Sequence, residues 1–269
     1  VQNLQELAEE LNLGLESFVY VDDSAAECER VRQALPQVFT IHLAGEPALR
    51  ADKIRALSGV FDTLAYSSED RVRSGMYRAE QERQQLKSQV ASLEDFYVSL
   101  AMELTIQRVE AASIARAAQL TQRTNQFNLT TRRYSESEIL ALTQSQNHEV
   151  FSARLQDRFG DNGLIGLAIL RREQAACHID TFLLSCRVIG RTVETAFLAF
   201  LLRRAQAWSA GVMTGAYHPT KKNGIVADFY ARHGFQEIQR SEAGTVWQLS
   251  GDQFQRAYPP WFRIHTPEE

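Results

Sequence analysis

Cys186 is the residue in this sequence whose position most suggests covalent chemistry. The stretch LLSCRVIGRTVETA, residues 183–196, places this cysteine between an apolar predicted strand and a glycine-containing turn. A thiol attacks as its thiolate, and a nearby helix N-terminus lowers the pKa of a cysteine. We therefore expect Cys186 to be a nucleophile with a lowered pKa. Taken alone, the sequence favours the alternative, a small buried hydrophobic residue, which is a frequent role of free cysteine.

The turn RVIGRT after this cysteine has the composition of a phosphate-binding loop. Glycine allows a ligand to approach the backbone closely, and the amides at a helix N-terminus bind phosphate oxygens. The long apolar pattern RTVETAFLAFLLRRAQAW predicts a helix that begins here. We therefore predict a pantetheine phosphate site at Arg187, Gly190, Arg191 and Thr192.

Two motifs resemble the GCN5-related N-acetyltransferase (GNAT) fold. Arg187, Gly190 and Thr192 resemble its Q/R-x-x-G-x-G/A signature, with threonine where a small residue is usual. Asn223, followed by FYARHGF, resembles its downstream motif at the expected distance. The resemblance implies an acyl-transfer domain, with Thr220, Lys222 and Asn223 near the pantetheine arm or a carrier-protein phosphate. For Lys222, a solvated surface charge is an equally open interpretation.

Two histidines are candidates for the base that activates Cys186. His178 precedes Cys186 by eight residues on one strand, which is about 26 Å and too far for a hydrogen bond. His218 follows the predicted strand GVMTGAY, and adjacent parallel strands bring their carboxyl ends to one edge. We therefore name His218 as the candidate base. A surface turn residue beside Pro219 is the alternative.

A polar cluster could bind the acyl group. Amide and guanidinium groups are suitable donors for a hydroxylated acyl group or for its charge. The predicted substrate-binding residues come from RTNQFNLTTRR and FGDNG, and they are Asn125, Gln126, Asn128, Arg132 and Asp161. The alternative is that these side chains satisfy backbone groups around a strand.

Adjacent carboxylates occur in VDDSAAE, residues 21–27. Asp22 and Asp23 follow an apolar strand pattern, and ligands of open α/β sheets bind at the carboxyl ends of strands. Aspartate is a suitable oxygen ligand for Mg²⁺, so the pair is a candidate metal site. A turn and helix cap is the equally supported alternative.

Composition limits the partners. The 269 residues carry 29 Lys and Arg against 33 Asp and Glu, a net charge of −4, so there is no basic field to hold nucleic acid or an anionic membrane. The 3 cysteines have no CxxC spacing, which argues against disulfides and structural zinc. The sequence shows no signal-peptide pattern or membrane-spanning apolar run, and a cytoplasmic location is expected.

The elements that position these residues form two groups. Helical spacing up to Gly14, the strand FVYVDD, a helix capped at Ser24, the strand VFTIHL and another helix predict a parallel sheet. A charged helix over about residues 68–90 follows, and we place the domain boundary near residue 94, giving domains 1–94 and 95–269.

The second domain is predicted to be mixed α/β. Helices are expected over about residues 111–123, from a capping box at Ser135, after Thr192, and at IVADFYARHGF before Gly234. VFSARLQDRF and GLIGLAILRR are expected to form a hairpin through the turn GDNG. HIDTFLLSC is expected to be a third strand, GVMTGAY a short strand and WQL the last strand.

Nearly the whole chain resembles the FkbH-like family, whose members join a haloacid-dehalogenase (HAD)-type phosphatase domain to a GNAT-like domain. The resemblance depends on FVYVDDSAAE, QLTQRTNQFNLTTRRY, DRFGDNG, IDTFLLSCRVIGR and PTKKN. It implies that Cys186 carries a glyceryl-type unit from a small phosphorylated hydroxyacyl donor as a thioester and passes it to the phosphopantetheine of an acyl carrier protein in polyketide-type biosynthesis. It also implies that Asp22 and Asp23 match the HAD magnesium motif.

One departure limits this resemblance. The sequence has no DxDxT-like stretch, and no lysine precedes Lys53. We therefore expect a partial HAD-like (Rossmannoid) segment without phosphatase activity, with Mg²⁺ binding only in a complete HAD domain, followed by a complete GNAT-like domain. The alternatives are a conventional GNAT that uses acyl-CoA and an amine, and a non-catalytic module that docks a carrier protein.

Overall fold

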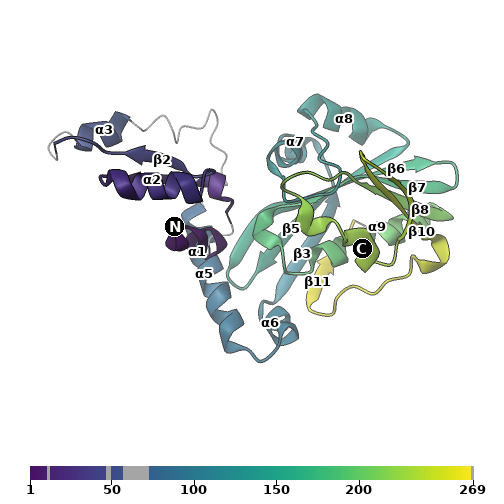
Figure 1. Cartoon of the computed structure of the whole chain (residues 1–269). Helices are drawn as coiled ribbons and strands as arrows, with labels where there is room; N and C mark the ends of the chain where they lie inside the picture. The colour runs from purple at the N-terminus through teal and green to yellow at the C-terminus, as the bar shows by residue number, and fades with distance from the viewer. Residues whose placement is uncertain (11–12, 47–49, 57–72, 268–269) are drawn as a thin grey trace. The chain divides into compact units, whose positions relative to one another are not determined.

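The computed structural model describes residues 1–10, 13–46, 50–56 and 73–267 (Figure 1). Contacts divide the chain into two compact units, Val1–Gln85 and Leu86–Glu269. This division lies inside a helix, whereas the sequence places the boundary near residue 94. The first residues of the predicted connecting helix, 68–72, lie outside the described part of the chain.

The first unit contains a short βαβ element. Its described elements are α1 (Gln2–Glu10), η1 (Leu15–Ser17), β1 (Val19–Asp22), α2 (Ala25–Ala34), β2 (Phe39–His42) and α3 (Arg50–Ala56). Ser24 caps α2 by accepting a hydrogen bond from the Glu27 amide, and β1 pairs with β2 in parallel. The expected parallel pairing is confirmed. Val31, Leu35 and Val38 form the small core of this unit.

The second unit is a mixed α/β domain. Helix α5 (Arg73–Gln89) leads into it, and its further helices are α6 (Leu93–Ser99), α7 (Ile114–Arg123), α8 (Glu136–Gln144), α9 (Val193–Ala207) and α10 (Phe229–Arg232). Its strands are β3 (Met102–Arg108), β4 (Phe127–Asn128), β5 (His148–Asp157), β6 (Gly160–Glu173), β7 (Ala176–Leu184), β8 (Val212–Tyr217), β9 (Gln236–Ser241), β10 (Gly244–Ser250) and β11 (Phe262–His265). Short 3-10 helices lie at η4 (Ala111–Ser113), η5 (Cys186–Val188), η6 (Gly224–Val226) and η7 (Gly251–Gln253).

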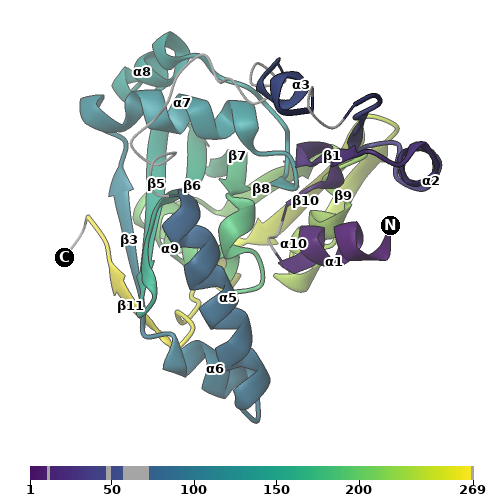
Figure 2. The same ribbon diagram turned by 90° about the vertical axis from the view of Figure 1, so that its left-hand side faces the viewer.

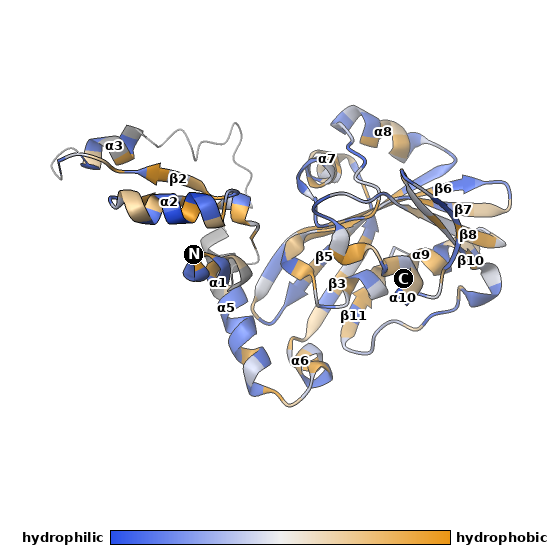
Figure 3. Cartoon of the chain, in the orientation of Figure 1, coloured by the Kyte–Doolittle hydropathy of each residue, from blue (hydrophilic) through white to orange (hydrophobic). Residues whose placement is uncertain are grey.

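One sheet organises this unit in the order β11-β3-β5-β6-β7-β8-β10-β9, with β4 paired to β7. The pairs β11–β3 and β7–β8 are parallel, and the other pairs are antiparallel. Helices α7 and α8 lie along one face (Figure 2), where Ala117 and Ile139 pack against the strands. Helix α9 belongs to the main core, and its largely apolar sequence is visible in Figure 3.

Several predicted elements are confirmed. Helix α7 ends at Arg123, and α8 has the full capping box between Ser135 and Glu138. Helix α9 begins at Val193, and Gly234 follows α10 with a φ of 75°, the left-handed conformation that glycine adopts readily. Within the described residues, no helix is both long and apolar enough to cross a bilayer.

The predicted hairpin turn at residues 160–163 is wrong. Asp157 pairs with Gly160, so the turn consists of Arg158 and Phe159, and the GDNG stretch belongs to β6. The Asp157 carboxylate accepts a hydrogen bond from the Phe159 amide and closes this turn. Gly163 has a φ of 68° beside a register shift, so its glycine serves a bulge in the strand.

The sequence interpretation also missed strands. The first strand of the sheet is β3, and Phe127 and Asn128 form the short strand β4; the sequence predicted neither of them. Strand β9 precedes β10 and β11 follows it, so the WQL strand is not the last. The edge strands β9 and β11 are largely exposed and have few buried apolar residues, whereas β3 alternates buried Met102, Leu104 and Ile106 with less buried residues.

Candidate functional site

Strands β7 and β8 separate toward their carboxyl ends. They pair directly over four residue pairs, from Ala176 with Val212 to Ile179 with Gly215. Beyond that point β4 lies between them, because Phe127 and Asn128 pair with Leu184 and Leu183. On its other side, the Leu129 carbonyl accepts a hydrogen bond from the His218 amide at 2.8 Å. The edge therefore presents the end of β7, the start of β4 and the end of β8.

Cys186 lies two residues beyond the end of β7, in η5. It is partly exposed, whereas Cys28 and Cys177 are fully buried. The thiol that the sequence singles out is therefore the one of the three with access to solvent.

The expected lowering of the Cys186 pKa is wrong. Burial raises the pKa of this thiol, and the positive charge of Arg187 and local backbone hydrogen bonds oppose that effect without outweighing it. Helix α9 begins at Val193, so residues 187–192 separate the thiol from the helix amides. At neutral pH the thiol is predominantly protonated, and nucleophilic attack requires a proton acceptor.

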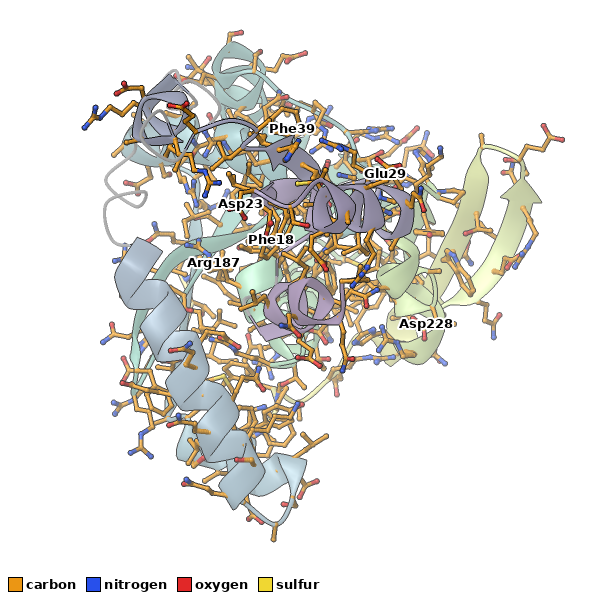
Figure 4. All side chains as sticks on the ribbon, turned by 60° about the vertical axis from the view of Figure 1, so that its left-hand side comes forward. Phe18, Asp23, Glu29, Phe39, Arg187 and Asp228 are labelled. Carbon is orange, nitrogen blue, oxygen red and sulfur yellow. The ribbon has the colours of Figure 1, made fainter. Side chains whose placement is uncertain are left out.

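Hydrogen bonds, two of them from residues outside the turn, hold the segment between Cys186 and α9. Gly190 has a φ of 80° and its carbonyl accepts a hydrogen bond from the Tyr97 hydroxyl at 3.1 Å. Thr192 has a φ of 60°, and its hydroxyl accepts a hydrogen bond from the Trp261 indole at 2.8 Å. The Nε of Arg187, which is labelled in Figure 4, donates a hydrogen bond to the Ser185 hydroxyl.

Arg191 does not have the predicted role of a ligand for phosphate. Its guanidinium is buried, pairs with Asp157 at 3.1 Å and also donates to the carbonyl of Arg187. These contacts fix the turn to the β5–β6 hairpin, so this prediction is corrected to a structural role.

Glu194, in the first turn of α9, has no counterpart in the sequence predictions. Its Oε2 atom is buried and has no hydrogen-bond partner among the described residues. Burial raises the pKa of this carboxyl, which favours its neutral form. The helix end therefore presents a carboxyl group beside the amides that were expected to bind phosphate. The acidic side chain in the first turn of the predicted helix is the sequence signal that could have revealed this carboxyl group.

His218 is not a neighbour of Cys186. The β4 backbone lies between the ends of β7 and β8, and two strand spacings are about 10 Å. The expected direct approach between these residues is therefore corrected, because an additional strand occupies the space that adjacent parallel strands would otherwise share.

Asn223 and Asn128 hold β4 in place. The fully buried Asn223 donates from Nδ2 to the carbonyls of Asn128 and His218, both at 2.9 Å. Its Oδ1 accepts from the amide and hydroxyl of Thr220. Asn128 is also buried, donates to the Thr124 carbonyl and accepts from the Thr131 amide. Their predicted cofactor-binding and substrate-binding roles are therefore corrected to structural ones.

The other predicted substrate and arm ligands have mixed surroundings. Arg132 forms an ion pair with Asp180, and Asp161 pairs with Arg154 and accepts from the Gly163 amide. Thr220 and Lys222 are exposed at the loop after β8. Asn125 and Gln126 are partly exposed at the start of β4. Their binding roles remain predictions.

In the first unit, the carboxylates of Asp22 and Asp23 are engaged locally. Asp22 accepts from the Ser24 amide at 2.7 Å and from the Tyr20 hydroxyl at 2.9 Å, which together lower its pKa. Asp23, labelled in Figure 4, pairs with Arg50 at 2.6 Å. No group of three or more His, Cys, Asp or Glu in the described ranges is arranged to hold a metal. The local partners of Asp22 and Asp23 match the turn-cap alternative, and the metal-binding role of the pair stays a prediction.

No protein-family model and no curated protein sequence matches the chain. Among solved structures, it is similar to the ribosomal-protein-S18-alanine N-acetyltransferase from Escherichia coli, at 15% identity and a TM-score of 0.43, over 55% of this chain and 93% of that one. It is also similar to the spermidine N-acetyltransferase from Vibrio cholerae, solved with CoA and spermine, at 13% identity and a TM-score of 0.44, over 57% and 99%. An acetyltransferase of the GNAT family from Staphylococcus aureus Mu50 is similar at 9% identity and a TM-score of 0.43, over 55% and 99%.

Proposed function

We propose that residues 86–269 form a GNAT-like acyltransferase in which Cys186 carries a small acyl group as a thioester. The observation that carries this proposal is the exposure of the cysteines. Cys186 is partly exposed just beyond a central strand, while the other two thiols are fully buried. Functional residues of α/β sheets gather at the carboxyl ends of strands. Cys186 is therefore the accessible nucleophile at the edge where chemistry is expected.

The reaction has two acyl-transfer steps. In the first, the Cys186 thiolate attacks the carbonyl carbon of an activated acyl donor, and the donor's leaving group departs with its electron pair. In the second, a thiolate of the acceptor attacks the Cys186 thioester and expels the Cys186 thiolate, which takes up the proton that the acceptor lost. One thioester replaces another, so the second step needs no further energy source.

The proposed acceptor is the phosphopantetheine thiol of an acyl carrier protein, and the acyl group is a small hydroxyacyl unit of the glyceryl type from a phosphorylated donor. The motif resemblance to the FkbH-like family supports this choice. Arg187, Gly190 and Thr192 are the proposed contacts for the arm, with Thr220 and Lys222 beyond β8. His218 remains a proposed proton carrier that acts only through an intervening group. The role of the first unit is proposed to be non-catalytic, as a partial HAD-like segment.

A second candidate is a conventional acyltransferase that moves an acyl group from CoA directly to an amine. The raised pKa of the Cys186 thiol favours this alternative, because a predominantly protonated thiol is a weak nucleophile. The third candidate is a non-catalytic module that docks a carrier protein.

Intact-protein mass spectrometry after incubation with acyl donors separates these functions. We expect an acyl adduct that maps to Cys186 and disappears on addition of holo carrier protein, with apo carrier protein as the control that lacks the thiol. Release of free CoA in the presence of an amine, with no adduct, would instead support the conventional acyltransferase. If neither an acyl adduct nor free CoA forms, the non-catalytic docking module is the remaining candidate.

A further inference from the structure

We infer that the Asn125 side-chain amide donates a hydrogen bond to the carbonyl oxygen of the acyl group during reaction at Cys186, and that Arg133 positions this amide. The inference deepens the proposed function and rests on it. It assigns a catalytic contact to Asn125, and it gives a positioning role to an arginine outside the predicted site.

Strand register places Asn125 and Cys186 at one edge. Phe127 pairs with Leu184 in an antiparallel arrangement. Asn125 precedes Phe127 by two residues, and Cys186 follows Leu184 by two residues. In an antiparallel pair, backward along one strand and forward along the other are the same direction. Both chains therefore leave the pair toward the same side, and both residues are partly exposed there.

The orientation of the Asn125 amide is fixed by a donor-only partner. The Arg133 guanidinium donates to Asn125 Oδ1 at 2.6 Å. An arginine has no acceptor, so the atom that it contacts must be the amide oxygen. The Nδ2 group then points away from Arg133, and it has no hydrogen-bond partner among the described residues. Its two N–H donors remain for a ligand.

Arg133 is itself held firmly. Its Nη1 donates to the carbonyl of Thr121 and, at 2.9 Å, to the carbonyl of Thr124. These carbonyls belong to the last turn of α7 and its cap, which have no further helical partners. The same guanidinium therefore completes the helix end and fixes Asn125 just after it. Asn128 provides the contrast, because both ends of its amide are used by the backbone.

The chemistry at Cys186 needs such a donor. When a thiolate adds to a carbonyl carbon, the C–S bond forms and the π electron pair moves to oxygen, which becomes negatively charged. Collapse restores the C=O bond and expels the leaving group. An amide donor fixed before reaction stabilises the oxyanion, and removal of one such donor typically slows reaction by roughly 10²- to 10³-fold.

The test compares two reactions of the same thiol in the full chain. Acylation by p-nitrophenyl acetate passes through an oxyanion, whereas alkylation by iodoacetamide is a direct displacement at carbon and does not. We expect Asn125→Ala to slow acylation of Cys186 by at least about tenfold while alkylation stays within about twofold of wild type. Asn147→Ala, at an exposed asparagine in the loop before β5, is the matched control and should change neither rate.

The positioning role of Arg133 is tested by a double-mutant cycle. Arg133→Gln should slow acylation without slowing alkylation, and it should cause no further loss in the Asn125→Ala background. Its effect on the melting temperature should persist in both backgrounds, because capping of α7 does not depend on Asn125.

An unchanged acylation-to-alkylation ratio in Asn125→Ala would overturn the inference and leave the proposed function standing. Equal losses of acylation and alkylation in Arg133→Gln would reduce that residue to a structural role and overturn the positioning claim. Failure of wild-type Cys186 to form any acetyl adduct would overturn both the inference and the proposed thioester.

Discussion

The two halves of the β7–β8 pair differ in what lies between the strands. In the first half, Ala176 to Ile179 pair directly with Val212 to Gly215. In the second half, β4 separates the strands and pairs with Leu183 and Leu184 of β7. Direct pairing produces a closed core, and the inserted segment produces an edge at which a loop from α7 lies beside the end of β7.

The cysteines of this strand show the consequence. Cys177 lies in the first half and is fully buried, which raises its pKa to about 12. Cys186 lies beyond the second half, where it is partly exposed and has Arg187 beside it. The same residue type is therefore inert at one end of the strand and accessible at the other.

The largest effect is expected for substitution of Cys186, the accessible cysteine. Cys186→Ala should abolish acyl loading, a loss of more than about 10³-fold, because no other thiol is accessible. Cys177→Ala is the matched control and should keep the loading rate while lowering the free energy of unfolding by about 1 kcal/mol. Radiolabelled acyl transfer and chemical denaturation measure the two effects. Wild-type transfer by the Cys186 variant would refute the thioester.

The pH dependence of alkylation should separate the same two thiols. The Cys186 pKa is raised in the fold, so its thiolate fraction is small at pH 7 and grows as pH rises toward that pKa. The rate of reaction with iodoacetamide should therefore rise about tenfold per pH unit between pH 7 and 9. Peptide mapping should show Cys177 unmodified in the native protein. A plateau of the Cys186 rate near pH 7 would contradict the raised pKa.

Gly215 belongs to the last residue pair that joins β7 directly to β8. Its substitution therefore tests the stability of the directly paired half. An ideal Cβ at this position would lie 2.1 Å from the Tyr230 hydroxyl oxygen, which is buried in the core. Gly215→Ala should therefore lower the free energy of unfolding by about 3 kcal/mol. Gly224→Ala is the control, because nothing lies within 4 Å of its Cβ position. Equal urea midpoints for the two variants would show that Tyr230 can move away.

Asn223→Ala should loosen only the second half. It removes the hydrogen bonds from Nδ2 to Asn128 and His218, so we expect a loss of about 2 kcal/mol. Hydrogen exchange should accelerate at the His218 amide, which donates to Leu129, and remain unchanged at Met213 in the first half. Uniform acceleration at both amides would mean that the two halves open together.

Local patterns in the sequence predicted much of the second unit correctly. The capping box of Ser135, the apolar run of α9 and the glycine at 234 specify their elements through neighbouring residues alone. The GDNG turn was misplaced because glycine permits a bulge as readily as a turn. Strand β3 was missed although its apolar residues Met102, Leu104 and Ile106 alternate with less buried ones, as a strand pattern requires.

The candidate site was predicted only in part. Residue type and the family resemblance named Cys186 and Asn125 as candidates, and their roles stay predictions. The structural roles of Arg191, Asn128 and Asn223 were not predicted, because a buried hydrogen-bonded amide or guanidinium has the same sequence signature as one that binds a ligand. Arg133 lies in the same stretch as the predicted residues but was missed, because its hydrogen bonds to the end of α7 and to Asn125 are set by the fold.

The sequence by itself determined most of the helices, the two strands of the predicted hairpin and the presence of a cysteine before a glycine turn, because periodicity, capping and turn residues act over a few neighbours. Only the tertiary structure decided that β4 enters between β7 and β8, that His218 is separated from Cys186, and that burial rather than a helix end sets the direction of the thiol pKa. These facts depend on hydrogen bonds between segments more than 50 residues apart, such as the Asn128–Asn223 contact, and on the desolvation that results from packing them together.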